Sequence, residues 1–210
     1  MPVLTARAFS EMLHLPGYEQ QRILIEQKYP RQGQSPFMIP YYKPALAELR
    51  SYFGNNHNHA QLALWAQEEA PSLKPHARAT NNARLVNSFL VSHSRDRMVV
   101  PSRFQRHFRG SPHPNVELKL SFDLVGIDEG AEKLVFINPR SNAIDHQVAE
   151  DTLQVAFWVI SQRDPDVKID SLEYWDLPSD TRYVVSRVAK RTITNMQNNA
   201  ALVDAIWNSL

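Results

Sequence analysis

The chain has 210 residues, of which 43% are hydrophobic and 21% charged, a composition that fits one globular domain with a full-sized core. Its formal net charge of +1 excludes the strong overall positive charge of many nucleic-acid binders, so any basic surface must be local. The sequence contains no cysteine, which excludes disulfides, iron–sulfur clusters and thiolate zinc sites.

Apolar residues at helical spacing predict five helices in the N-terminal part of the chain, residues 1–94. Prolines, and a turn rich in glycine and asparagine, separate these helices. The expected ranges are 5–14, 18–29, 44–52, 60–70 and 77–92. The N-terminus is a poor signal peptide and no window reaches the ~18 apolar residues of a membrane span, so we expect a soluble, cytoplasmic protein.

Strands are predicted in the second half of the chain, residues 95–210. Two apolar runs, 118–127 and 133–137, flank a polar break that contains a glycine, a pattern typical of an antiparallel hairpin. An amphipathic helix at 147–162, a second hairpin at 171–187 and a C-terminal helix at 192–210 follow. We therefore expect a single domain of class α/β or α+β, residues 1–210, in which a sheet is flanked by helices.

Residues 95–114 are predicted to form a basic, mostly irregular connector. Two aromatic residues, Phe104 and Phe108, are interleaved with its cations, a pattern suited to contacts with backbone phosphates and to stacking on bases. The alternative is an ordinary charged loop in solvent. The candidate nucleic-acid-binding residues are Arg103, Arg106, His107 and Arg109.

Three polar residues of the first predicted hairpin could take part in binding or catalysis. Asp123 lies inside an apolar run, where a carboxylate is costly to bury unless it is paired. Asn138 and Arg140 stand at the end of the next run, and a period of two places them on one face of the strand. The sequence thus predicts one acid opposite an amide and a guanidinium.

These segments together resemble the PD-(D/E)XK nucleases, and most closely the RecB-like branch that includes CRISPR-adaptation nucleases. The matching pieces are FDLV at 122–125, KLVFINPR at 133–140, LQVAFW at 153–158 and the closing hairpin at 172–185. The resemblance implies a restriction-endonuclease-like mixed central sheet flanked by helices. It also implies a remnant catalytic site made of Asp123, Asn138, Arg140, Lys119 and Gln154.

The chain departs from this family where the catalytic motif should be. Nucleases of the family have Asp/Glu-x-Lys, and this chain has Asn138-Pro139-Arg140. Magnesium needs anionic oxygens because it gives up water reluctantly, and an amide supplies no charge. Arginine cannot serve as a base, although it can bind phosphate in a bidentate manner. We therefore expect no metal cofactor, and a pseudo-nuclease that binds nucleic acid or a protein partner in a DNA-processing or defence assembly.

Two other functions stay open. A divergent active nuclease would hold magnesium or manganese with Asp123 and with Glu150 or Asp151, beside Lys119 or Arg140. The third possibility is a purely structural or interaction protein.

Each remnant residue also has a structural interpretation. Asp123 could be an acid paired with Arg140 or Lys119. Asn138 and Arg140 could form an ordinary strand end that leads into a turn. Gln154 could point at the former site or face solvent.

Overall fold

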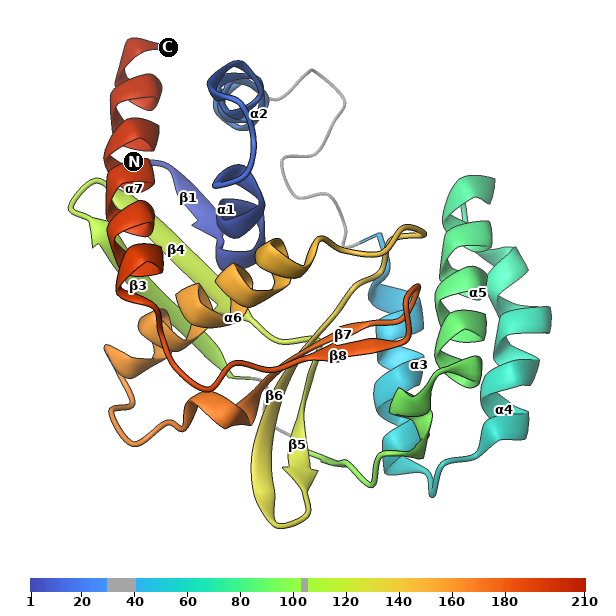
Figure 1. Cartoon of the computed structure of the whole chain (residues 1–210). Coiled ribbons are helices and arrows are strands. Elements are labelled where there is room, and N and C mark those ends of the chain that lie inside the picture. The colour runs from blue at the N-terminus through green and yellow to red at the C-terminus, as the bar shows by residue number, and fades with distance from the viewer. Residues whose placement is uncertain (30–40, 103–105) are drawn as a thin grey trace.

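The computed structural model describes residues 1–29, 41–102 and 106–210, which form a mixed α+β fold (Figure 1). The strands are β1 (Val3–Thr5), β2 (Val100–Pro101), β3 (His107–His113), β4 (Val116–Ser121), β5 (Leu124–Asp128), β6 (Ala131–Ile137), β7 (Leu172–Asp176) and β8 (Thr181–Tyr183). One sheet has the order β1–β4–β3, and the other has the order β2–β5–β6–β7–β8. The expected combination of sheet and flanking helices is confirmed.

The α-helices of the described residues confirm each helix that the sequence predicts, with small shifts at the ends. They are α1 (Ala6–Met12), α2 (Gly17–Lys28), α3 (Lys43–Gly54), α4 (His59–Leu64), α5 (His76–Val91), α6 (His146–Ser161) and α7 (Lys190–Ser209). The helix expected at 60–70 differs most, because α4 continues as a π-helical turn at Trp65–Glu69 and a 3-10 turn at Ala70–Ser72. None of the helices described is both long and apolar enough to cross a bilayer.

The first predicted hairpin is confirmed in part. Strands β5 and β6 pair antiparallel around Glu129 and Gly130, both of which have positive φ. The apolar run 118–127, however, does not form one strand. It divides at Phe122 and Asp123 into β4 of the first sheet and β5 of the second. The chain thus passes from one sheet to the other at the position of the candidate acid.

The prediction that residues 95–114 are mostly irregular is wrong for β3. This strand pairs antiparallel with β4, although its sequence HFRGSPH contains glycine and proline. Its partner β4 alternates buried and more exposed residues, so one face of the β3–β4 pair is covered and the other is open. Tertiary pairing with β4 therefore outweighs the low strand propensity of β3.

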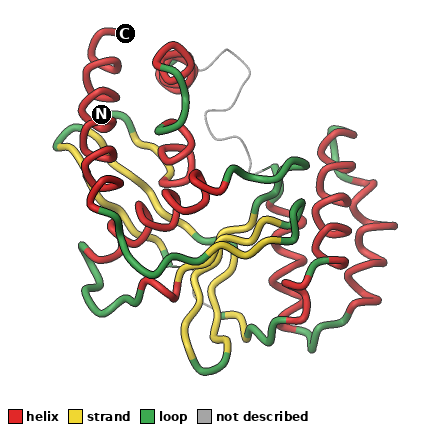
Figure 2. The backbone as a smooth tube through the Cα atoms, in the orientation of Figure 1, coloured by secondary structure: helices red, strands yellow, loops and turns green. Residues whose placement is uncertain are grey.

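The second sheet has apolar residues on both faces. Leu134 and Phe136 of β6 join a core with residues of α1, α6 and α7, and we name this side the α6 face. Val135 and Ile137, which alternate with them, join a second core with α3 and α5, and we name this side the α3 face. Figure 2 shows the strands in the middle of the molecule with helices on either side. The parallel neighbours β6 and β7 are connected through α6.

Candidate functional site

Asp123 lies at the junction between β4 and β5 and is held from several sides. Its Oδ2 accepts hydrogen bonds from the Ile137 amide at 2.8 Å and from Nη2 of Arg7 at 2.5 Å. Its main-chain carbonyl accepts a hydrogen bond from Nε of Arg50 at 2.6 Å. The expectation that Arg140 or Lys119 pairs with this acid is wrong. The partner is Arg7, which comes 116 residues earlier in the chain and left no signal in the sequence around Asp123.

Arg7 is fixed in place by the start of α1 and by two aromatic rings. Thr5 caps α1, because its Oγ1 accepts a hydrogen bond from the Ala8 amide at 3.1 Å. The guanidinium carbon of Arg7 lies 5.2 Å from the ring centre of Phe136 and 5.6 Å from that of Tyr174. Both rings belong to the α6 face.

The electrostatics of this contact keep Arg7 charged and Tyr174 neutral. Burial acts to lower the pKa of Arg7, but the Asp123 carboxylate, Tyr174 and Glu11 together raise it above its ordinary value. Burial raises the pKa of Tyr174 to about 12, against the opposing effect of Arg7. The positive charge beside Asp123 is thus a permanent part of the site.

Asn138 and Arg140 are bound to different partners. Asn138 is 2% exposed, and its Nδ2 donates to Oδ1 of Asp176 at 2.6 Å and to the Asn142 carbonyl at 2.9 Å. Nη2 of Arg140 donates to Oε2 of Glu11 at 2.7 Å. Asn138 therefore shapes the loop after β6, and Arg140 ties that loop to α1. Glu11 and Asp176, which the sequence analysis did not select, complete these contacts.

Gln154 is 6% exposed, so the alternative in which it faces solvent is wrong. Its Oε1 accepts a hydrogen bond from the Ala189 amide at 2.6 Å. Ala189 is the N-cap residue of α7. The described contact of Gln154 therefore anchors the start of the C-terminal helix.

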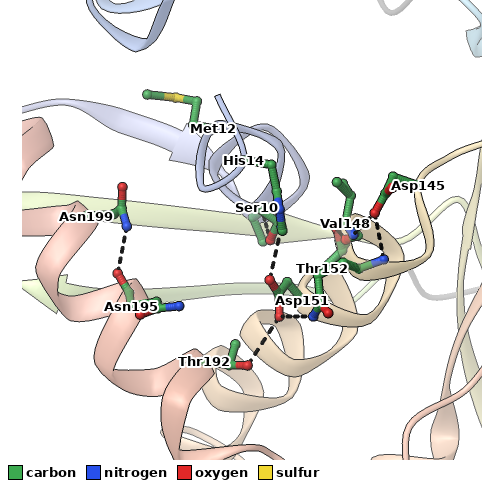
Figure 3. A network of polar contacts seen from close by, with 12 residues as sticks. Ser10, Met12, His14, Asp145, Val148, Asp151, Thr152, Thr192, Asn195 and Asn199 are labelled. Carbon is green, nitrogen blue, oxygen red and sulfur yellow. Dashed lines mark hydrogen bonds and ion pairs between the residues drawn. The ribbon is translucent and has the colours of Figure 1, made fainter. Parts of the chain in front are cut away.

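The two acids considered as replacement metal ligands face other groups. Oδ2 of Asp151 lies 3.0 Å from Nε2 of His14, and its Oδ1 accepts a hydrogen bond from Thr192 at 3.2 Å (Figure 3). This cluster joins the turn after α1 to α6 and α7. Glu150 pairs with His146, one turn earlier on the same helix, at 3.2 Å. Neither acid is among the described contacts of Asp123.

The residues around Asp123 do not fit a divalent cation. Within residues 1–29, 41–102 and 106–210, no group of three or more His, Asp or Glu side chains is placed to hold a metal ion. One oxygen of the Asp123 carboxylate is already paired with the guanidinium of Arg7. A cation there would have to displace Arg7 or lie beside it, and like charges repel.

A basic surface lies on the open face of the first sheet. His107 and Arg109 of β3 are exposed, and their register partners on β4 are Ser121 and Lys119, which are also exposed. We name these four residues the β3–β4 face. Nη1 of Arg109 lies 3.0 Å from Oε1 of Glu117. Two of the predicted nucleic-acid-binding residues thus lie beside the predicted remnant Lys119.

Other predicted residues do not contribute to this face. Nη1 of Arg106 pairs with Glu132 at 3.1 Å and with Asp164 at 3.3 Å, so its charge is matched by two acids. Phe108 packs against the apolar core and does not offer its ring for base stacking. Arg103 and Phe104 lie outside the described residues.

A pocket of about 140 Å³ adjoins the β3–β4 face, and we name it the Asp123 pocket. Its polar lining residues are Thr5, Arg7, Lys119, Ser121 and Asp123. The charges of Arg7 and Asp123 balance each other, whereas Lys119 forms no ion pair with any described residue. The pocket therefore carries one uncompensated positive charge.

Comparison with known proteins adds no family to this geometry. No protein-family model matches the sequence, and a search of curated proteins finds no match.

Proposed function

We propose that this protein is a catalytically degenerate scaffold of the restriction-endonuclease-like fold that binds the phosphate backbone of nucleic acid through the β3–β4 face. The observation that carries the proposal is the cross-strand pair Arg109 and Lys119, placed beside a pocket in which Arg7 neutralises Asp123. The order of β5, β6, α6, β7 and β8 agrees with the RecB-like resemblance of the sequence. A DNA-processing or defence assembly is the proposed setting.

A net charge of only +1 is compatible with this function, because Arg109 and Lys119 lie together and have one acidic partner between them among the described residues, Glu117. Phosphate contacts depend on the cations that touch the backbone and on the counterions they release. Arg109 and Lys119 lie directly opposite each other on antiparallel strands, and His107 is two residues from Arg109 on β3. Arginine can bind a phosphate in a bidentate manner, and lysine acts as a point charge.

The same contacts argue against hydrolysis at Asp123. The Asp123 carboxylate is bound to Arg7, the Asn138 amide to Asp176, and the Arg140 guanidinium to Glu11. Each of these three residues is thus engaged in a contact within the fold. Nucleic acid would be bound there without being cut.

Fluorescence anisotropy with labelled single- and double-stranded DNA tests the binding. We expect affinity that falls steeply with salt, and a salt slope reduced by about one for Arg109→Gln and for Lys119→Met. The matched control is Arg22→Gln on α2, because Arg22 is also exposed and also has one glutamate partner, Glu26 at 3.4 Å. No affinity at low salt would overturn nucleic-acid binding and favour a protein partner.

Plasmid cleavage with magnesium and with manganese tests the loss of catalysis. We expect intact plasmid with the wild-type protein and with Asp123→Ala. Cleavage that is present in the wild type and absent in this variant would contradict the proposal and establish a divergent nuclease.

A further inference from the structure

We propose that the Asp123 pocket binds a single phosphate group, either as orthophosphate or as the terminal phosphate of a nucleic-acid strand. The nucleic-acid form of this ligand rests on the proposed function. The binding of the phosphate group itself rests on the charge, donors, size and rigidity of the pocket.

The charge of the pocket selects an anion. Its two cations are Arg7 and Lys119, and its one acid is Asp123. Nη2 of Arg7 lies 2.5 Å from that acid, which leaves the Lys119 ammonium without a counter-charge among the described residues. A phosphate would supply this counter-charge, whereas a metal ion would add to the excess.

The pocket also has spare hydrogen-bond donors. A guanidinium has five N–H donors, and the described hydrogen bonds of Arg7 use one of them, toward Asp123. The Lys119 ammonium has three donors. Thr5 uses its hydroxyl oxygen as an acceptor for the Ala8 amide, so its O–H can still donate, and Ser121 adds a second hydroxyl. Charge-assisted hydrogen bonds of this kind are the strong ones that hold phosphate oxygens.

The size of the pocket fits one phosphate group. Its volume of about 140 Å³ is well above the roughly 10–15 Å³ that a cavity needs to hold one water molecule. Pockets that enclose a drug-sized ligand have about 300–1,000 Å³. The pocket therefore has room for a phosphate and its remaining water but not for a whole nucleoside.

The arginine of the pocket is held rigidly. Arg7 is fixed by Asp123 on one side and by the rings of Phe136 and Tyr174 on the other. Asp123 is fixed in turn by Arg50 and by the Ile137 amide. Donors that are already in place lose little conformational freedom when a ligand arrives.

The position of the pocket explains why a strand terminus would reach it. Lys119 and Ser121 belong both to the β3–β4 face and to the lining of the pocket. A strand whose phosphates contact Arg109 and Lys119 would therefore meet the pocket at the edge of the face. A terminal phosphate can enter it, whereas an internal phosphodiester carries a nucleoside on both sides.

Isothermal titration calorimetry tests this site with three probes. They are orthophosphate, manganese chloride, and a pair of oligonucleotides of one sequence with and without a 5′-phosphate. We expect heat with orthophosphate, none with manganese, and tighter binding of the phosphorylated oligonucleotide. Lys119→Met should weaken orthophosphate binding about tenfold, the loss of one charge-assisted contact.

Two exposed positions separate this inference from the proposed function. Ser121→Ala changes both the pocket and the face and should weaken orthophosphate binding. Arg109→Gln changes only the face, so it should bind orthophosphate like the wild type. Orthophosphate binding without any affinity for DNA would retain the phosphate pocket and remove the proposed function. DNA binding that ignores the 5′-phosphate, together with no heat from orthophosphate, would remove the pocket and retain the function. Heat from manganese in place of orthophosphate would also overturn the inference.

Discussion

On the α3 face of the second sheet the Glu173 carboxylate is closed off from solvent, whereas on the α6 face Asp123 borders an open pocket. The Glu173 side chain is 1% exposed and accepts a hydrogen bond from Nε1 of Trp175 at 2.8 Å. Three cations surround it at 3.4 to 3.5 Å, namely Arg97, Lys133 and Arg182. Asp123 has one cation at 2.5 Å and a side chain that is 17% exposed.

The difference shows that an ion pair between a carboxylate and a cation can stabilise the fold alone or can also form part of a binding site. Around Glu173, Arg97 also pairs with the buried Asp128, so each cation of this cluster has an acid as its partner. Around Asp123, the neighbouring Lys119 is left with its charge toward the pocket. A closed network stabilises the fold, and an open one with a spare cation can also bind a ligand.

The largest effect on stability is expected for the buried Glu173 on the α3 face. Glu173→Gln should lower the free energy of unfolding by about 3–5 kcal/mol, because it removes the charge of a buried acid on which three cations converge. Urea denaturation measures this. The matched change is Arg182→Gln, whose side chain is 47% exposed and which should lose less than about 1 kcal/mol. Equal stability of Glu173→Gln and wild type would show that the network contributes nothing.

Tyr174 follows Glu173 on β7 and lies on the α6 face, and the pH dependence of stability tests its environment. Tyr174 faces Arg7, and its pKa is about 12 in the folded chain against 10.0 for the free side chain. A raised folded pKa means that the stabilisation is complete below pH 10 and is lost as the pH rises toward 12. Two pKa units correspond to about 3 kcal/mol.

Urea denaturation at stepwise pH isolates this effect when the wild type is compared with Tyr174→Phe. The difference in unfolding free energy between them should change between pH 10 and pH 12 and should be constant at lower pH. A difference that stays flat across the whole range would mean that Tyr174 ionises as easily in the folded chain as in the unfolded one.

The smallest effects are expected at the edge of the Asp123 pocket. Arg7→Gln should cost about 2 kcal/mol, because a partly buried carboxylate and two ring contacts lose their cation. Arg140→Gln should cost less than about 1 kcal/mol, since the Arg140 side chain is 62% exposed. Thermal unfolding measures both. A larger loss for Arg140→Gln than for Arg7→Gln would reverse the assignment of the structural partner.

Local periodicity was enough to predict most of the fold. The helices, the β5–β6 pairing and the β7–β8 hairpin follow patterns contained within a few turns or one loop. Strand β3 was missed because its residues favour a loop and only the pairing with β4 makes them extended. The division at Phe122 and Asp123 was missed because no glycine or proline marks it.

The candidate site was harder to predict because its contacts join distant parts of the chain. The polarity of Asp123 within an apolar run correctly indicated that it needs a partner. Arg7, Glu11 and Arg50 could not be selected, because on their own helices they look like ordinary surface charges. Lys119 and Arg109 were selected separately, and only the register of β3 against β4 shows that they are neighbours.

The passage of the chain between the sheets at Phe122 and Asp123 restricts how this protein can evolve. Leu120 and Phe122 pack in the core of the α6 face before the crossing, whereas Leu124 packs in the core of the α3 face and Val125 in that of the α6 face, so the alternation shifts by one residue at the junction. One added residue would turn every later side chain of β5 to the opposite side. Homologues should therefore keep the length of the segment from Lys119 to Leu124 fixed.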